Sequence, residues 1–233
     1  MNGKRNLPDT DLDKLSRLKG LSWLPATQLK LLAGALTVRS FARHEVVLRG
    51  AAMASEAHIL LGGIARITCV DAHRERVTVA LLAPGPIPEF PALPDSRLDF
   101  RCEAYNDCRI GSLSWEDFNH LTAHGSNLAF KRFHQNDLQQ WYRVLLRASS
   151  FLDLDLHERI GITLLELAAD FGIKESRGML LRAPFSHQDI ADLVGASRPR
   201  VTEHLARFET EQLIVRQGRQ FIVCSDKSGF HNN

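Results

Sequence analysis

The sequence has few cysteines and no long apolar run, and each of these shortages excludes a class of protein. Its four cysteines, Cys69, Cys102, Cys108 and Cys224, form no CxxC pair and no spacing typical of zinc or iron–sulfur sites. No apolar run approaches the roughly 20 residues that a transmembrane helix requires. The polar N-terminal segment lacks the apolar stretch of a secretory signal. We therefore expect a cytoplasmic protein with reduced thiols and no membrane partner.

The chain also has little net charge. Its 233 residues include 29 Lys and Arg against 27 Asp and Glu, which gives a net charge of +2. A surface that binds nucleic acid would therefore have to be local rather than global. With 44% apolar and 24% charged residues, the composition is that of a folded globular protein.

The residue pattern becomes β-rich near Leu36. Short runs rich in strand-forming residues follow, and glycine or proline turns separate them: TVRSF, EVVLRG, HILLGGIARITCV, RVTVALL and CRIGSLSW. This spacing predicts a small β-roll or barrel over residues 21–118, after an N-terminal arm of residues 1–20. The stretch PGPIPEFPALPDSR holds five of the nine prolines, so we expect it to be a stiff loop.

From Trp115 to about residue 150 the apolar spacing becomes helical. Positions about 3.5 residues apart form a seam with one polar member: His134, Leu138, Trp141, Leu145 and Ala148. Such a seam is explained by packing on its own domain or by pairing with the same helix of a second copy. For the helix expected over residues 119–150, the pattern alone is equally consistent with both explanations, and the dimerisation helix is what the family resemblance described below implies.

The strongest local pattern is SHQDIADLVGASRPRVTEHLARFETEQLI, residues 186–214. Ser186 and Asp189 match a capping box, Gly195 suits a tight turn, and Ser197 is placed to cap a second helix. Two short helices joined by such a turn form a helix-turn-helix, whose second helix enters the DNA major groove. The next residues, LIVRQGRQFIV, predict a two-stranded wing. We expect a winged helix-turn-helix over residues 151–226 and a polar tail over 227–233.

Candidate DNA-binding side chains gather at the two helix starts and on the wing. Arg198 can bond guanine in a bidentate manner, and Arg200 can do the same or contact phosphate. Burial of Val201, Leu205 and Phe208 would leave Glu203 and His204 pointing outward. The candidate set is Gln188, Ser197, Arg198, Arg200, Glu203, Arg216 and Arg219, to which the family resemblance described next adds Pro199.

At these residues the chain resembles the bacterial cAMP-receptor-protein/fumarate-nitrate-regulator (CRP/FNR) family of transcription regulators. DIADLVGASRPRVTEHLARFETEQLI and the basic hairpin carry the resemblance, with HILLGGIARI at the place of a strand–Gly–strand motif. It implies an α+β fold with a cyclic-nucleotide-binding-type β-roll, a long dimerisation helix and a C-terminal winged helix-turn-helix. It also implies a homodimer that binds a two-fold symmetric site on double-stranded DNA, with RNA polymerase as a further partner.

The sequence departs from this family at two groove-reading positions and in the sensor. Pro199 stands where Glu is frequent and Glu203 where Arg is frequent, so the best-known operators of the family are poor predictions. In the sensor, Pro88-Glu89-Phe90 and Leu98-Asp99 replace the Gly-Glu-Leu and Arg-Ser of the cAMP binders. Because Asp99 would repel the cyclic phosphate and Pro88 lacks a backbone donor, we expect no cAMP binding of the usual kind. The candidate lining of an effector pocket is Glu89, Phe90, Arg97 and Arg101.

Other effectors and other functions are weighed in the same way. Haem would need an axial ligand, for which His58, Cys69 and His73 lie in the right region. A lone histidine is more often a surface or core residue, so the effector stays open. His120 and His124 have no visible third ligand, and no catalytic constellation is recognisable, so we expect neither an enzyme nor a metal site. The alternatives are a regulator whose DNA binding needs a ligand or haem, and a sensor module that does not bind DNA.

Overall fold

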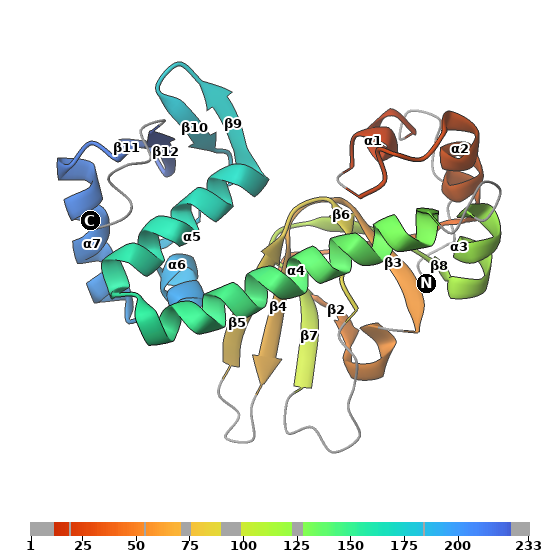
Figure 1. The fold of residues 1–233 in the computed structure, drawn as a ribbon, viewed down its shortest axis with the longest axis horizontal. Coiled ribbons are helices and arrows are strands. Elements are labelled where there is room, and N and C mark those ends of the chain that lie inside the picture. The colour runs from red at the N-terminus through yellow and green to blue at the C-terminus, as the bar shows by residue number, and fades with distance from the viewer. Residues whose placement is uncertain are drawn as a thin grey trace. The chain divides into compact units, whose positions relative to one another are not determined.

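The computed structural model describes residues 12–18, 20–53, 55–70, 76–89, 99–122, 128–183 and 185–224 (Figure 1). The chain divides into two compact units, Met1–Arg143 and Val144–Asn233. The boundary falls inside helix α4 (Leu128–Asp153), so the first part of this helix belongs to one unit and its end to the other.

The first unit is a roll of two antiparallel sheets preceded and followed by helices. Its helices are α1 (Leu12–Arg17), α2 (Ala26–Ala35), the 3-10 turn η2 (Gly50–Met53) and α3 (Trp115–Thr122). Its strands are β1 (Thr37–Phe41), β2 (Val46–Arg49), β3 (Glu56–Gly62), β4 (Ala65–Val70), β5 (Arg76–Leu82), β6 (Gly85–Pro86), β7 (Asp99–Ala104) and β8 (Cys108–Ser114). The sheets have the orders β1-β8-β3-β6 and β2-β7-β4-β5, which confirms the predicted β-roll.

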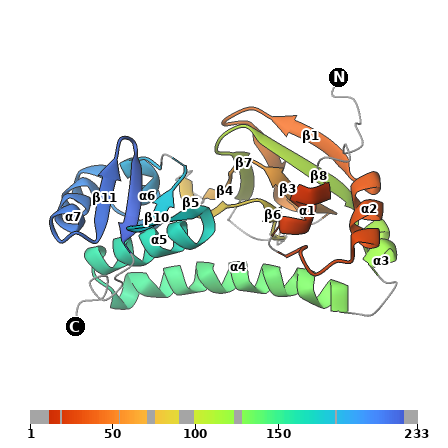
Figure 2. The same ribbon diagram turned by 90° about the horizontal axis from the view of Figure 1, so that it is seen from above.

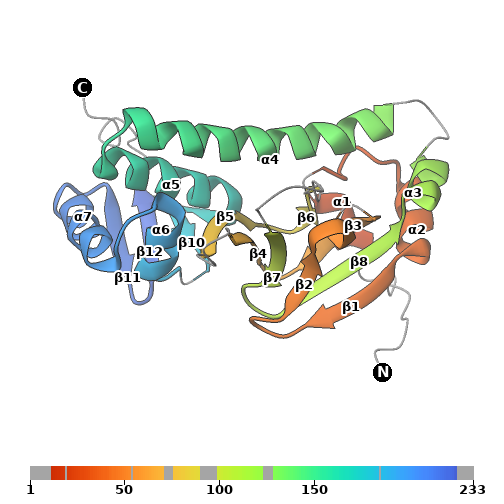
Figure 3. The same ribbon diagram turned by 90° about the horizontal axis from the view of Figure 1, so that it is seen from below.

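The first sheet is covered on both faces. Ile59 packs with α1, α2 and α3 in one core cluster, whereas its neighbour Leu60 packs with Ile67 and Cys102 of the second sheet. Successive residues of a strand point to opposite faces, so one buried strand joins the two cores. This explains why Ile59, Leu60 and Leu61 are all apolar, without alternation. Figure 3 shows α2 and α3 beside the ends of β1 and β8.

Residues 119–150, expected as one helix, include the end of α3 and most of α4, and residues 123–127 between these helices lie outside the described ranges. One sequence prediction for the first unit needs correction. The proline-rich stretch contains the short strand β6, which pairs with β3 at the edge of its sheet, where proline is tolerated.

The second unit combines the end of α4 and helices α5, α6 and α7 with a four-stranded antiparallel sheet (Figure 2). Its elements are α5 (Leu156–Phe171), β9 (Gly172–Glu175), β10 (Gly178–Leu181), α6 (His187–Val194), α7 (Arg198–Thr210), β11 (Ile214–Gln217) and β12 (Gln220–Cys224). The strand order is β11-β12-β10-β9, so the wing hairpin β11–β12 is continuous with the hairpin β9–β10. Ile160, Leu205 and Phe208 are fully buried between these elements. Within the described ranges, no helix has the length and hydropathy that a membrane crossing would need.

Candidate nucleic-acid interface

The start of α6 has the predicted capping box. The Ser186 hydroxyl accepts a hydrogen bond from the Asp189 N–H at 3.1 Å, and the Asp189 carboxylate accepts one from the Ser186 N–H at 2.8 Å. These bonds satisfy backbone donors that a helix start otherwise leaves unpaired, and they set the direction in which α6 begins.

The turn between α6 and α7 requires glycine. Gly195 has φ 62° and ψ 45°, the left-handed region that side chains with a Cβ disfavour. A Cβ at this position would also lie 2.6 Å from Cε1 of Phe151. Conformation and close packing therefore both account for the glycine that the sequence pattern singled out.

The first turn of α7 exposes a basic tip. Ser197, Arg198, Pro199 and Arg200 are all exposed, while Val201, Leu205 and Phe208 on the opposite side are completely buried. In the part of the chain that the structure describes, neither arginine of the tip forms an ion pair. Ser197 occupies the N-cap position, but its hydroxyl makes no capping bond, so that part of the prediction was wrong.

The two arginines of the wing have different surroundings. Arg219 is exposed and forms no ion pair with the described residues. Arg216 bonds the Glu209 carboxylate through Nη2 at 2.9 Å and Nε at 3.0 Å, and lies 5.3 Å from the centroid of the Phe221 ring. Arg216 therefore attaches the wing to α7, whereas Arg219 keeps its guanidinium available.

The remaining candidates of the helix-turn-helix fall into two groups. Gln188 and Glu203 are exposed, and the Gln188 amide donates a hydrogen bond to Asp192 at 2.7 Å. His204 does not point outward as expected. It is half-buried, and its Nδ1 lies 3.3 Å from Nδ1 of the buried His157 of α5.

Sequence reasoning missed a small network that connects α6, α7 and the wing. His187 Nδ1 lies 2.8 Å from the Thr202 hydroxyl, which donates to the Arg198 carbonyl, and Arg216 Nη2 lies 3.5 Å from His187 Nε2. Burial, then Arg216 and Arg198, lower the pKa of His187, which favours the neutral ring. A neutral ring with its proton on Nδ1 donates to Thr202 and accepts from Arg216. No local signal reveals this pairing, because its members are far apart in the sequence.

Of the candidate effector-pocket residues of the β-roll, the structure describes Glu89 and Arg101. The Arg101 guanidinium bonds the Asp99 carboxylate of the same strand at 2.6 and 2.8 Å. Glu89 is half-buried, and its carbonyl accepts a hydrogen bond from the Trp141 indole at 3.3 Å. Phe90 and Arg97 lie outside the described residues.

Of the candidate haem ligands, the structure describes His58 and Cys69. His58 is buried, with Nδ1 2.8 Å from the Ser112 hydroxyl and Nε2 3.0 Å from the Ala52 carbonyl, so both ring nitrogens are engaged. Cys69 is half-buried, and His73 lies outside the described ranges. This arrangement does not offer His58 as an axial ligand.

The seam of α4 is divided between two faces of the helix. Leu138 and Leu145 are 67% and 65% exposed, and Ala148 is exposed too. Trp141 instead packs on the β-roll, with its ring edge-on to Phe100 at 6.4 Å between centroids. Its neighbour Tyr142 is 62% exposed. His134 lies on α4, but its side chain is outside what the structure describes.

Known proteins share both the helix-turn-helix and the whole fold. Residues 158–231 match the family of Crp-like helix-turn-helix domains. TTHB099, a CRP-family transcriptional regulator from Thermus thermophilus, is 24% identical over 82% of this chain and 94% of that chain, with a TM-score of 0.62. FixK2 from Bradyrhizobium japonicum is 18% identical over 84% and 96%, with a TM-score of 0.68. No curated protein matches the sequence.

A third similar structure is the c-di-GMP responsive global regulator CLP from Xanthomonas campestris. It is 18% identical over 87% of this chain and all of that chain, with a TM-score of 0.65. These likenesses show the fold, an α+β protein with a β-rich N-terminal domain, a long helix and a C-terminal helix-turn-helix with wing strands.

The family match identifies residues 158–231, which hold the helix-turn-helix and its wing, as a Crp-like helix-turn-helix domain. In fold, the chain is similar to solved transcription regulators of the CRP/FNR family.

Proposed function

We propose that the protein is a homodimer that binds a two-fold symmetric operator, with the start of each α7 in a major groove. The observation that carries this proposal is the exposed basic tip of α7, in which Arg198 and Arg200 flank Pro199. A helix start also offers unpaired N–H groups to phosphate, and Ser197 adds a hydroxyl that makes no capping bond. Arg219 of the wing adds a phosphate contact beside the groove.

Glu203 gives the DNA-reading surface, formed by the start of α7, a preference for one base over others. It is exposed on the same helix as the basic tip, one turn after Arg200. A carboxylate in the groove accepts from the amino group of cytosine and repels phosphate. Gln188, at the start of α6, supplies a polar contact to the backbone.

Dimerisation is supported by a stripe of exposed apolar residues on α4, which we call the α4 stripe. It consists of Leu138, Tyr142, Leu145 and Leu152, and Leu152 is 85% exposed. Their spacing of four, three and seven residues follows a heptad seam, which suits a partner helix of the same kind. Large apolar residues gathered on one helix face favour coverage by another chain.

The other parts of the proposal concern the sensor and its surroundings. The β-roll over residues 21–118 acts as a sensor that does not bind cAMP in the usual way. Asp99 would repel the cyclic phosphate, and it already accepts a hydrogen bond from the Arg101 guanidinium. Residues 119–150, which include the end of α3 and most of α4, transmit the signal to residues 151–226. The protein works in the cytoplasm, where DNA and RNA polymerase are its partners. A regulator that binds DNA only with an effector is the second candidate, which the β-roll supports.

Selection of bound sequences from a random pool of double-stranded DNA tests this function. The purified protein should enrich a palindrome with half-sites about one helical turn apart. A double variant, Arg198→Ala with Arg200→Ala, is the matched control and should enrich none. If enrichment needs added cell extract, the effector-dependent form is correct. Failure to enrich any sequence with or without extract would contradict DNA reading by α7.

A further inference from the structure

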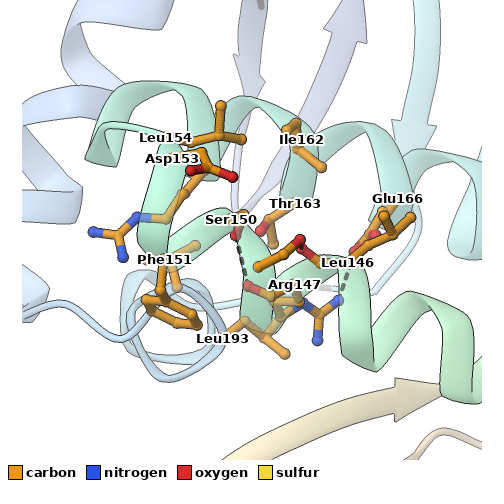
Figure 4. Close-up of a pocket in the computed structure, with 13 residues that line it drawn as sticks. Leu146, Arg147, Ser150, Phe151, Asp153, Leu154, Ile162, Thr163, Glu166 and Leu193 are labelled. Carbon is orange, nitrogen blue, oxygen red and sulfur yellow. Dashed lines mark hydrogen bonds and ion pairs between the residues drawn. The ribbon is translucent and has the colours of Figure 1, made fainter.

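The second unit contains a cavity of about 290 Å³ next to the turn of the helix-turn-helix. Its walls come from the end of α4, from α5 and from the last residues of α6 (Figure 4). The volume is near the lower end of the range of small-molecule sites, which begins at about 300 Å³. None of the candidate DNA-binding side chains lines it, so it is separate from the reading surface.

The walls of the cavity are mostly apolar. Leu146 and Phe151 come from α4, Ile162 from α5, and Leu193 from α6. Leu146 and Phe151 remain 47% and 45% exposed although they are large apolar side chains. Such walls favour a ligand with an apolar body that removes these surfaces from water.

The polar groups of the cavity differ in how well they are satisfied. Arg147 and Glu166 neutralise each other in an ion pair, drawn as a dashed line in Figure 4. The Arg159 guanidinium lies 4.7 Å from the centroid of the Phe151 ring, and its buried Nε has no hydrogen-bond partner among the described residues. Asp153 also lines the cavity, but it is exposed, so water screens its charge. Arg159 lines the cavity and forms no ion pair with the described residues, so its guanidinium is the cation that an acceptor on a ligand would meet.

We propose that this cavity binds a small organic ligand with a flat apolar body and an oxygen acceptor, either a carboxylate or a carbonyl. The body packs against Leu146, Ile162 and Leu193, and the oxygen accepts a hydrogen bond from the guanidinium of Arg159. The same body with an ammonium group in place of the acceptor does not fit, because it would put a second donor against Arg159.

The ligand is also a regulator, and this part rests on the proposed function. Phe151 connects the cavity to the turn, because its Cε1 would lie 2.6 Å from a Cβ at Gly195. Leu193 lines the cavity two residues before the same glycine. A ligand that fixes Phe151 and Leu193 therefore restrains the turn from which the basic tip of α7 starts.

Titration calorimetry on the full chain tests binding with three probes of one shape: naphthoate, naphthamide and naphthylmethylamine. Naphthoate should bind saturably and the amine should not. Naphthamide binding as tightly as naphthoate would identify a carbonyl ligand, and much weaker binding would identify a carboxylate. Failure of both acceptor probes to bind, or equal binding of the amine, overturns the proposal.

Variants locate the site. Arg159→Leu should weaken naphthoate binding at least about tenfold, as expected for one charge-assisted hydrogen bond. Arg177→Leu makes the same change at an exposed position in the β9–β10 turn and should leave binding unchanged. Leu146→Trp narrows the cavity at an exposed residue and should also weaken binding if Arg159→Leu does not fold. Undiminished binding by the folded variants overturns the assignment.

The regulatory part has its own readout. The affinity for the selected operator should change at least about fivefold with saturating naphthoate, and Arg159→Leu should abolish this change. An unchanged operator affinity despite measured naphthoate binding overturns the regulatory role and leaves the site. A protein that binds naphthoate but no DNA would instead contradict the proposed function, so the two failures are distinguishable.

Discussion

The arginines of α7 and the wing differ in whether they already pair with a carboxylate. Arg216 is neutralised by Glu209, and the same guanidinium lies beside the neutral ring of His187. Arg198 has no such carboxylate partner among the described residues. An arginine held in this way is a positioning residue, whereas one with five unused donors can bond a base edge.

Arg198→Ala should therefore remove discrimination at one base position. The loss should be about 1–3 kcal/mol for the preferred base and much smaller for its replacements. Fluorescence anisotropy with the selected operator and its single-base variants measures this. An equal loss on every sequence would make Arg198 a phosphate contact.

The buried His157 should make the stability of the protein depend on pH. It is 3% exposed and stacks on Phe208 at 4.0 Å between centroids. Burial lowers its pKa below the ordinary value of 6.5, and Arg207 acts in the same direction while Glu211 opposes it. A histidine with a lowered pKa in the folded state binds its proton more tightly when unfolded, so stability is lost as the pH falls below 6.5.

His157→Phe keeps the stacking and removes this titration. Its free energy of unfolding should fall less between about pH 7 and pH 5 than that of the original protein, as measured by urea unfolding. His120→Phe, at a side chain 79% exposed on α3, is the control and should retain the original pH dependence. Identical pH profiles for the original protein and His157→Phe would show that other groups dominate.

At the scale of elements, the turn between α6 and α7 is constrained by its own backbone and by Phe151. Gly195→Ala should destabilise the protein by at least about 1–2 kcal/mol, because the left-handed conformation disfavours a Cβ and the close approach adds to this cost. Gly34→Ala in α2 is the matched control, since a Cβ there meets nothing within 4 Å. It should stabilise by about 0.5–1 kcal/mol. Thermal unfolding of both variants measures the difference.

Substitutions at neighbouring residues of α4 should have different effects, one on dimerisation and the other on stability. Tyr142→Glu or Leu145→Glu places a charge on the α4 stripe and should shift the protein toward the monomer, as sedimentation measures. Trp141→Ala should instead lower the stability of the β-roll by at most about 3–5 kcal/mol. This range applies to a fully buried ring, and the Trp141 ring is half-buried against Phe100. An unchanged dimer in both glutamate variants would refute pairing through this stripe.

At the scale of the whole molecule, a net charge of +2 makes DNA affinity depend on where the charges lie. The logarithm of the association constant should fall steeply and linearly with the logarithm of salt concentration. Arg219→Ala should reduce this slope by about 1 and weaken all sequences equally. Arg177→Ala, in the β9–β10 turn, should leave the slope unchanged. A slope near zero for the original protein would contradict phosphate binding.

The sequence by itself determined what short-range physics controls. The capping box at Ser186, the left-handed turn at Gly195 and the β-rich spacing after Leu36 each follow from local preferences, and the structure has all three. Strand β7 could also have been found, because Asp99, Arg101 and Glu103 alternate with Phe100, Cys102 and Ala104.

Only the tertiary structure decided which of two similar residues has which role. Periodicity could not separate Trp141 from Tyr142, because the β-roll that covers one of them comes from distant parts of the chain. It could not pair Arg216 with Glu209, or place His204 against His157, for the same reason. The cavity beside Gly195 likewise needs three helices to form. Side-chain partners depend on packing between elements, and local preference contains no information about that packing.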